Sequence, residues 1–360
     1  MKSQTVYVST RASMLTTSSP LQVQEISIDY TNCNTTAPRQ DSTNFDPTAE
    51  NQLESIPSGR VSSTFKSNAD PAAMWGWGRE NYTFESGVSL ETNVCILSFT
   101  IPEAIKPPIL FYYRLTNFYQ NHRRYVKSVD IDQLKGDVRS ASDLSSGDCS
   151  PLDNDPETGL PYYPCGLIAN SMFNDTFSNL TLANPAGGSD ASGQNYTMTV
   201  EGTSWSHEGD LYGKTKYKPE DVVPPPNWQQ QYPNGRYNGS LPDLHTWEQF
   251  QVWMRTAGLP TFSKLYQRND HDELSAGTYR LKIYDRKFFG SYLVPFFEDK
   301  LLMFMCVYRL PRRQVQRYQI YPHLYAHRHG RQEPVPRYRI PCCGRYLHLV
   351  GRGVPGYASH

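Results

Sequence analysis

The chain has 360 residues, enough for one large or two ordinary domains, and its formal net charge is zero. A neutral balance gives no general attraction to nucleic acid or anionic membrane, and 25 tyrosines and 27 prolines favour short strands and loops over a helical bundle. The charge is uneven: residues 308–360 hold ten arginines, one glutamate and no lysine or aspartate, so this tail carries +9 and the remainder −9.

Several short segments have the periodicity of strands. Residues 23–30 and 277–284 alternate between apolar and polar side chains, and residues 94–101 form a nearly continuous apolar run. Residues 73–83, rich in Trp and Gly, predict a turn region instead. Together these segments predict a mainly β (α+β) fold: an antiparallel, sandwich-like domain with long loops and one or a few short helices.

Residues 107–128 combine a predicted strand with a cationic, aromatic segment. Ile109, Phe111, Tyr113 and Leu115 alternate onto one face of the strand. The simpler interpretation is a half-buried strand followed by a solvated turn. The alternative is a surface for a protein partner, because aromatic residues and Arg are enriched at interface hot spots. The candidate contact residues are Tyr112, Tyr113, Arg114, Arg123 and Arg124.

Residues 244–257 give the strongest helical pattern. Thr246 and Gln249 fit a capping box, and Gly258 and Pro260 predict its end. The helix has an apolar stripe that predicts core packing, formed by Trp247, Phe250, Trp253, Met254 and Ala257.

The cysteines and the Asn-X-Ser/Thr sequons point to an oxidising compartment. Four of the seven cysteines lie in the body of the chain without a CxxC pair: Cys33, Cys95, Cys149 and Cys165. Closing the short loop from Cys149 to Cys165 would be worth about 3 kcal/mol. The body also contains six sequons, which begin at Asn34, Asn81, Asn174, Asn179, Asn195 and Asn238. This combination predicts a lumenal or extracellular domain.

No clear export signal accompanies that prediction. Residues 1–22 lack the apolar core of a signal peptide. Residues 288–307 approach membrane-span length, but Glu298, Asp299 and Lys300 interrupt them at a cost of roughly 8 kcal/mol, so we expect no membrane helix there.

Catalytic and cofactor motifs do not occur in the sequence. We find no P-loop, GxSxG, HExxH or dinucleotide-binding glycine pattern, and we expect no catalytic residue, no cofactor and no enzyme activity. The tail brings together His323, His327, His329, Cys342 and Cys343, but adjacent cysteines rarely share a tetrahedral site, so no metal is expected.

Several blocks resemble one protein family, in family order. These are VQEISIDYTNC, the segment from CILSFTI through FYYRLTNFYQNHRRYVKS, PCGLIANSMFNDTF, PPPNW and HTWEQFQVWMRTAGLPTFSKLYQR. They resemble the cell-division-cycle-fifty / ligand-effect-modulator family, the non-catalytic β subunits of type-four P-type ATPases, which are phospholipid flippases.

The resemblance implies a two-pass membrane protein whose large, glycosylated ectodomain clasps a flippase ATPase in a heterodimer. Such a subunit supports folding of the ATPase, its exit from the endoplasmic reticulum towards the Golgi and plasma membrane, and lipid flipping, and it meets lipid only indirectly. The resemblance also implies disulfides Cys33–Cys95 and Cys149–Cys165 and a glycan on Asn174.

Both ends depart from the family pattern. Residues 1–21 form an atypical extension where a membrane helix is expected, so residues 22–285 are the predicted ectodomain. If the codons for residues 309 onward are read one base later, permitted codon choices yield two sequences that resemble the family. These are the strand FPV…GTKS and the segment NPFLGIAY. We therefore hypothesise a retained intron over residues 286–307 and an out-of-frame, disordered tail over residues 308–360, which transcript sequencing tests.

A second function class fits part of the sequence. A secreted, disulfide-bonded, lectin-like β-sandwich binding module would account for the aromatic residues, the cysteines and the sequons. It does not account for the ordered blocks. Sugar binding without ATPase association would favour the lectin. The lipid substrate and the particular ATPase are not encoded in these patterns.

Overall fold

The computed structural model describes residues 5–9, 23–39, 52–67, 69–183, 193–286 and 300–306, and of 5–9 and 300–306 it describes the backbone. The tail 308–360, with its histidines and cysteines, therefore lies outside the described residues, as do most of residues 1–21 and 286–307.

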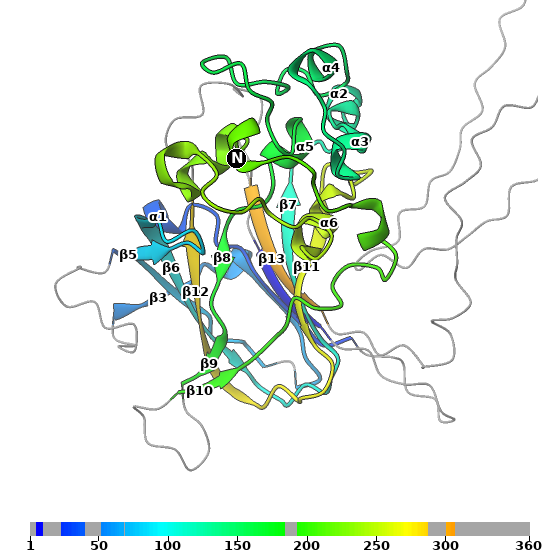
Figure 1. Cartoon of the computed structure of the whole chain (residues 1–360). Helices are drawn as coiled ribbons and strands as arrows, with labels where there is room; N and C mark the ends of the chain where they lie inside the picture. Colours follow the sequence, from blue (N-terminus) through cyan, green and yellow to red (C-terminus); the bar gives the residue numbers. More distant parts are fainter. Residues whose placement is uncertain are drawn as a thin grey trace, which may run out of the picture. The chain divides into compact units, whose positions relative to one another are not determined.

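The described strands form two antiparallel sheets (Figure 1). The first has the order β1 (Thr5–Ser9), β2 (Glu25–Ile28), β13 (Lys300–Cys306), β7 (Ile109–Thr116) and β11 (Phe262–Asn269), with an additional pairing of β1 with β7. The second has the order β10 (Gln194–Tyr196), β9 (Leu180–Leu182), β12 (Gly277–Asp285), β6 (Ser89–Ile101), β5 (Met74–Thr83) and β3 (Glu54–Ser55), and β8 (Thr176–Phe177) pairs with β12. A further strand, β4 (Val61–Thr64), packs beside β2.

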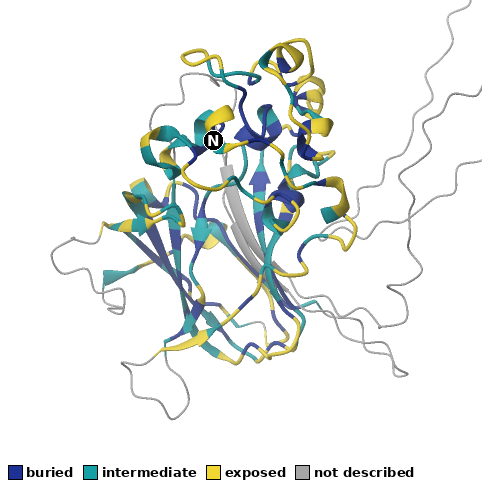
Figure 2. Ribbon diagram, in the orientation of Figure 1, coloured by how far each residue is buried: buried dark blue, intermediate teal, exposed yellow. Residues whose placement is uncertain are grey.

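Both sheets bury side chains in one shared core. Ile28 of β2, Phe111 of β7 and Leu281 of β12 belong to the same cluster of buried residues. The ring of Phe111 meets that of Phe177 of β8 edge-on, with centroids 5.2 Å apart. Figure 2 shows the buried residues running along the strands. The predicted β-rich, antiparallel, sandwich-like fold is confirmed.

The alternation predicted for β7 is also confirmed. Ile109, Phe111, Tyr113 and Leu115 are at most 3% exposed, and they belong to the shared core. The apolar run in β6 is buried on both faces, since Val94 and Leu97 are both fully buried. A continuous apolar run is typical of a strand covered on both sides.

The turn predicted at residues 73–83 is wrong, because β5 is a ten-residue strand paired with β6 along its whole length. Its glycines lie where another part of the chain comes close: the Sγ of Cys33 is 3.5 Å from the carbonyl oxygen of Gly76. The amide of Trp77 donates to the carbonyl of Pro38 at 3.0 Å. Glycine within a strand often marks such a close approach of a second backbone.

Short helices gather near one end of the strands, and α1 lies beside β5 (Figure 1). The α-helices are α1 (Cys33–Thr36), α2 (Arg123–Lys127), α3 (Ile131–Leu134), α4 (Ala141–Ser145), α5 (Leu167–Asn170) and α6 (Glu248–Met254). The 3₁₀ turns are η2 (Ser58–Arg60), η3 (Gly209–Leu211), η4 (Pro219–Asp221), η5 (Pro226–Gln231) and η6 (Pro233–Gly235).

The helix predicted at residues 244–257 is shorter than expected. It begins at Glu248 after the N-cap residue Trp247, and no side chain caps it. The predicted capping box is wrong, because the hydroxyl of Thr246 donates to the carbonyl of Asp243. The predicted stripe does face the core: Phe250 is fully buried and Trp253 is 1% exposed.

Candidate functional site

The predicted partner-contact residues fall into two groups. Tyr113 is 3% exposed, and its ring stacks on Phe173 with centroids 3.9 Å apart. Tyr113 therefore packs in the core, and its burial argues against the predicted partner contact. Tyr112 and Arg114 point to the opposite face of β7 and are half-buried, whereas Arg123 and Arg124 on α2 are exposed.

Exposed apolar side chains also occur on α2 and in the segment just before it. Tyr119 and Val126 are 48% and 41% exposed. The loop at residues 258–260 lies alongside, because the amide of Phe118 donates to Pro260 and the side chain of Asn121 donates to Gly258. That loop presents an exposed leucine. We call this set the α2 surface; it comprises Tyr119, Arg123, Arg124, Val126 and Leu259.

The four body cysteines form two disulfides. One joins Cys33 of α1 to Cys95 of β6, and the other joins Cys149 to Cys165. All four residues are at most 4% exposed. The first disulfide fixes the segment after β2 to the second sheet. The second closes the loop of residues 149–165, which follows α4.

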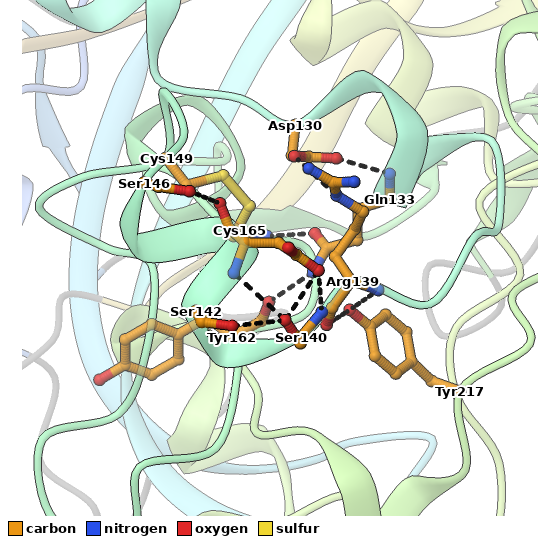
Figure 3. A network of polar contacts seen from close by, with 11 residues as sticks. Asp130, Gln133, Arg139, Ser140, Ser142, Ser146, Cys149, Tyr162, Cys165 and Tyr217 are labelled. Carbon is orange, nitrogen blue, oxygen red and sulfur yellow. Dashed lines mark hydrogen bonds and ion pairs between the residues drawn. A yellow bond between two sulfur atoms is a disulfide. The ribbon is translucent and has the colours of Figure 1, made fainter.

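A polar network surrounds the second disulfide (Figure 3). The side-chain amide of Gln133, which is fully buried, accepts from the amide of Cys165 at 2.8 Å and donates to the carbonyl of Tyr162 at 2.9 Å. Asp130 caps α3 by accepting from the amide of Gln133, and it also pairs with Arg139 at 3.4 Å. The loops near α3 and α4 are thus held by hydrogen bonds as well as by the Cys149–Cys165 disulfide.

The six sequons lie in different environments. Asn81, Asn179, Asn195 and Asn238 are exposed, whereas Asn34 and Asn174 are half-buried. The side-chain amide of Asn174 donates to the carbonyl of Arg286 at 2.6 Å, and the Nε of Arg286 donates back to the carbonyl of Asn174 at 2.5 Å.

A cleft of about 840 Å³ opens beside Asn174. Its walls come from six separate parts of the chain: the β5–β6 hairpin, β7, residues 172–176, residues 228–249, β11 and Arg286. The lining includes aromatic rings such as those of Tyr82, Tyr232 and Trp247 and the carboxylates of Glu85 and Asp243. The Ser86 hydroxyl donates to the carbonyl of Gln231 and so joins two of the walls.

Arg286 forms part of this cleft. Its guanidinium carbon lies 5.0 Å from the ring centroids of both Tyr82 and Phe84, a cation–π arrangement. Burial lowers the pKa of Arg286, while the neighbouring Tyr82 and Asp175 favour its charged form. Arg286 therefore binds the hairpin to the segment that carries Asn174.

Lys264 of β11 has a structural role that the sequence did not reveal. It is 7% exposed, and its Nζ donates to the carbonyls of Val252 at 2.9 Å, Trp253 at 3.4 Å and Arg255. These carbonyls end α6, so the ammonium group satisfies acceptors that the helix leaves free. Burial, followed by repulsion from Arg255, lowers the pKa of Lys264 to about 7.

Two negative findings concern only the part of the chain that the structure describes. There, three or more His, Cys, Asp or Glu side chains never come together in a way that could hold a metal ion. Across the same residues, every helix is too short or too polar to cross a bilayer.

Comparison with known proteins defines the class. Residues 15–298 match the model of the LEM3 (ligand-effect modulator 3) family / CDC50 family. The chain belongs to this family, and the predicted resemblance is confirmed.

The relatives carry consistent names. The chain is 42% identical over 266 residues to the phospholipid-transporting ATPase accessory subunit CDC50 of Chaetomium thermophilum, which covers 72% of this chain and 62% of that protein. It is 39% identical over 278 residues to the accessory subunit CRF1 of Saccharomyces cerevisiae, covering 76% and 64%. Cell cycle control protein 50A of Mus musculus is 39% identical over 205 residues, covering 52% and 54%. The chain thus spans slightly less than two thirds of the two fungal relatives.

Proposed function

We propose that this chain is the accessory subunit of a phospholipid-translocating P-type ATPase, with which it forms a heterodimer. In this role it supports folding of the ATPase, its exit from the endoplasmic reticulum and its lipid flipping, and it carries out no catalysis itself. The family match over residues 15–298 is the observation that carries this proposal. The fungal relatives, which are named accessory subunits of phospholipid-transporting ATPases, support it.

We place residues 22–285 in the lumen of the endomembrane system or outside the plasma membrane. Two buried disulfides support this placement, because such bonds persist in oxidising compartments. Four exposed sequons are consistent with access to the glycosylation machinery of that compartment.

The α2 surface is our candidate for contact with the ATPase. It combines Arg123 and Arg124 with three exposed apolar side chains, and Arg together with Tyr is enriched at interface hot spots. The arginines lie on a helix that is anchored by its buried Tyr125, whose hydroxyl shares a hydrogen bond of 2.8 Å with the hydroxyl of Ser171. A fixed helix presents its side chains with little loss of conformational entropy on binding.

Co-expression with a type-four P-type ATPase of the same organism tests the proposal. The full chain carries an affinity tag, and the ATPase that co-purifies is measured together with its exit from the endoplasmic reticulum. We expect the double variant Arg123→Glu/Arg124→Glu to reduce co-purification about tenfold, the effect of about 1.4 kcal/mol. The matched control Lys214→Glu/Lys218→Glu reverses two exposed charges outside the α2 surface and should bind normally.

The outcomes separate the claims. No co-purification of any type-four ATPase with the wild-type chain would contradict the proposed function. Equal loss of ATPase co-purification in both variants would contradict only the assignment of the α2 surface as the contact with the ATPase. Sugar binding without ATPase association would support the lectin-like alternative.

A further inference from the structure

The cleft beside Asn174 has the chemical character of a carbohydrate site. The rings of Tyr232 and Trp247 are half-buried, so part of each faces the opening. Sugar rings offer apolar C–H faces that pack on aromatic rings and hydroxyl edges that bond to carboxylates and amides. Glu85, Asp243 and Gln231 supply such polar groups in the lining. The volume of 840 Å³ lies within the range of about 300–1,000 Å³ for sites that hold small ligands.

One sequon lies at the rim of that cleft. Asn238 and Ser240, the first and third residues of an Asn-Gly-Ser sequon, both line it. Asn238 is exposed, and Gly239 between the two has φ +86°, the left-handed conformation that glycine adopts without strain. The preceding Tyr237 is 6% exposed and donates its hydroxyl hydrogen to the carbonyl of Tyr163 at 2.5 Å. A buried anchor therefore fixes the chain next to Asn238.

The other five sequons do not combine these properties. Asn34, Asn81, Asn179 and Asn195 are not among the residues that line the cleft. Asn174 lines it but is half-buried, with its amide bonded to Arg286. Among the six sequons, all of which fall within the described ranges, only Asn238 is both exposed and at the cleft.

We propose that Asn238 carries an N-linked glycan whose first sugar residues lie in this cleft against Tyr232 and Trp247. The inference relies on the lumenal placement in the proposed function. In the modification, the Nδ2 of Asn238 forms a bond to the anomeric carbon of a lipid-pyrophosphate-linked oligosaccharide. The bond from that carbon to the pyrophosphate oxygen breaks, the lipid pyrophosphate leaves with the electron pair, and Nδ2 loses one proton. The attached sugar then covers aromatic surface that the protein leaves open.

The test uses the full chain, directed into the secretory pathway of a fungal host by a cleavable signal sequence. Mass spectrometry measures the occupancy of Asn238 and of Asn195, an exposed sequon away from the cleft. An endoglycosidase that cuts between the first two sugars is then applied to the native protein. We expect release from Asn238 to be about tenfold slower than from Asn195, and the two rates to become equal after denaturation.

Two variants sharpen the result. Trp247→Ala removes one stacking surface and should raise native release at Asn238 without changing release at Asn195. Thr176→Val removes the sequon of Asn174 but keeps its amide and both bonds to Arg286, so it should leave the protection of Asn238 in place. If the protection disappears, the cleft belongs to a glycan on Asn174 and the proposal fails. Because the wild-type comparison needs no variant, a Trp247→Ala protein that does not fold leaves the proposal testable.

Failure can be assigned to one proposal or the other. An unoccupied Asn238, or equal release from Asn238 and Asn195 in the native protein, overturns the cleft assignment. Because the signal sequence itself directs the chain into the lumen, this result leaves the proposed function untouched, and co-purification of the ATPase tests that function separately.

Discussion

Asn174 and Arg286 bind each other twice. The Nε of Arg286 donates to the backbone carbonyl of Asn174 at 2.5 Å, and the side-chain amide of Asn174 donates to the backbone carbonyl of Arg286 at 2.6 Å. N-glycosylation replaces one of the two amide hydrogens, so a glycosylated Asn174 still has a hydrogen with which to donate. The sequon and the structural contact are therefore compatible.

This pair predicts a difference between two ways of removing the sequon. Asn174→Gln removes both the glycan and the amide geometry, whereas Thr176→Val removes the glycan, keeps the amide and preserves a β-branched residue in β8. We expect Asn174→Gln to be less stable than Thr176→Val by about 1 kcal/mol, the value of one hydrogen bond. Urea unfolding of both proteins measures this, and equal midpoints would show that the amide contributes nothing.

Lys264 predicts a pH dependence of stability. Its pKa is lowered to about 7 in the folded protein from 10.5, so between these pH values the unfolded chain binds more protons than the folded one. Stability must therefore rise with pH over this window, by about 2 kcal/mol between pH 7 and pH 9. Unfolding at a series of pH values in wild type and Lys264→Met measures it. Identical slopes in the two proteins would contradict the assignment, and Lys135→Met, at an exposed site, serves as the control.

The two disulfides should contribute unequally to the free energy of unfolding. Cys33 and Cys95 are 62 residues apart, whereas Cys149 and Cys165 are 16 apart. In the chain-entropy model, loops of these lengths correspond to about 4 and about 3 kcal/mol. We expect the Cys33→Ala/Cys95→Ala protein to have the lower free energy of unfolding. A larger loss in the Cys149→Ala/Cys165→Ala protein would mean that strain or residual structure outweighs loop entropy.

Gln133 should be sensitive to substitution. Gln133→Met keeps the approximate volume but leaves the amide of Cys165 and the carbonyl of Tyr162 without their partner, both in a buried site. Each unsatisfied group costs about 1–3 kcal/mol, so we expect a loss of roughly 2–6 kcal/mol for the two. Thermal unfolding measures the loss, with the exposed Asp132→Asn as control. A change below about 1 kcal/mol would show that water replaces the amide.

Part of the fold was predictable because local pattern and tertiary packing agree. The alternation predicted for β7 is present in the structure because one face of the strand packs against the shared core. The strand β5 was missed because its glycines are typical of turns, and the approach of α1 to the carbonyl of Gly76 is a tertiary contact that the local sequence does not show. The helix start was misplaced because Thr246 bonds to Asp243 instead of capping.

The site was less predictable than the fold. The disulfide partners came from the family resemblance, since spacing leaves several pairings open. Sequons can be found in the sequence, but their relation to a cleft cannot, because the walls of the cleft come from six separate segments. The role of Lys264 was missed because its acceptors end a helix 9 to 12 residues earlier, and no helix or strand periodicity relates positions at that separation.

The register of β12 on β6 has a consequence for biosynthesis. Gly277 pairs with Ile101 and Asp285 with Asn93, so nine consecutive positions of β6 find their partner only when residues near 285 have been made. At translation rates of about 5–20 residues per second, a ribosome needs roughly ten seconds or more between the two strands. During that interval one edge of β6, which carries the buried side chains of Leu97 and Phe99, remains unpaired by β12 and open to chaperones or to aggregation. The nascent chain is thus most vulnerable in the middle of its synthesis.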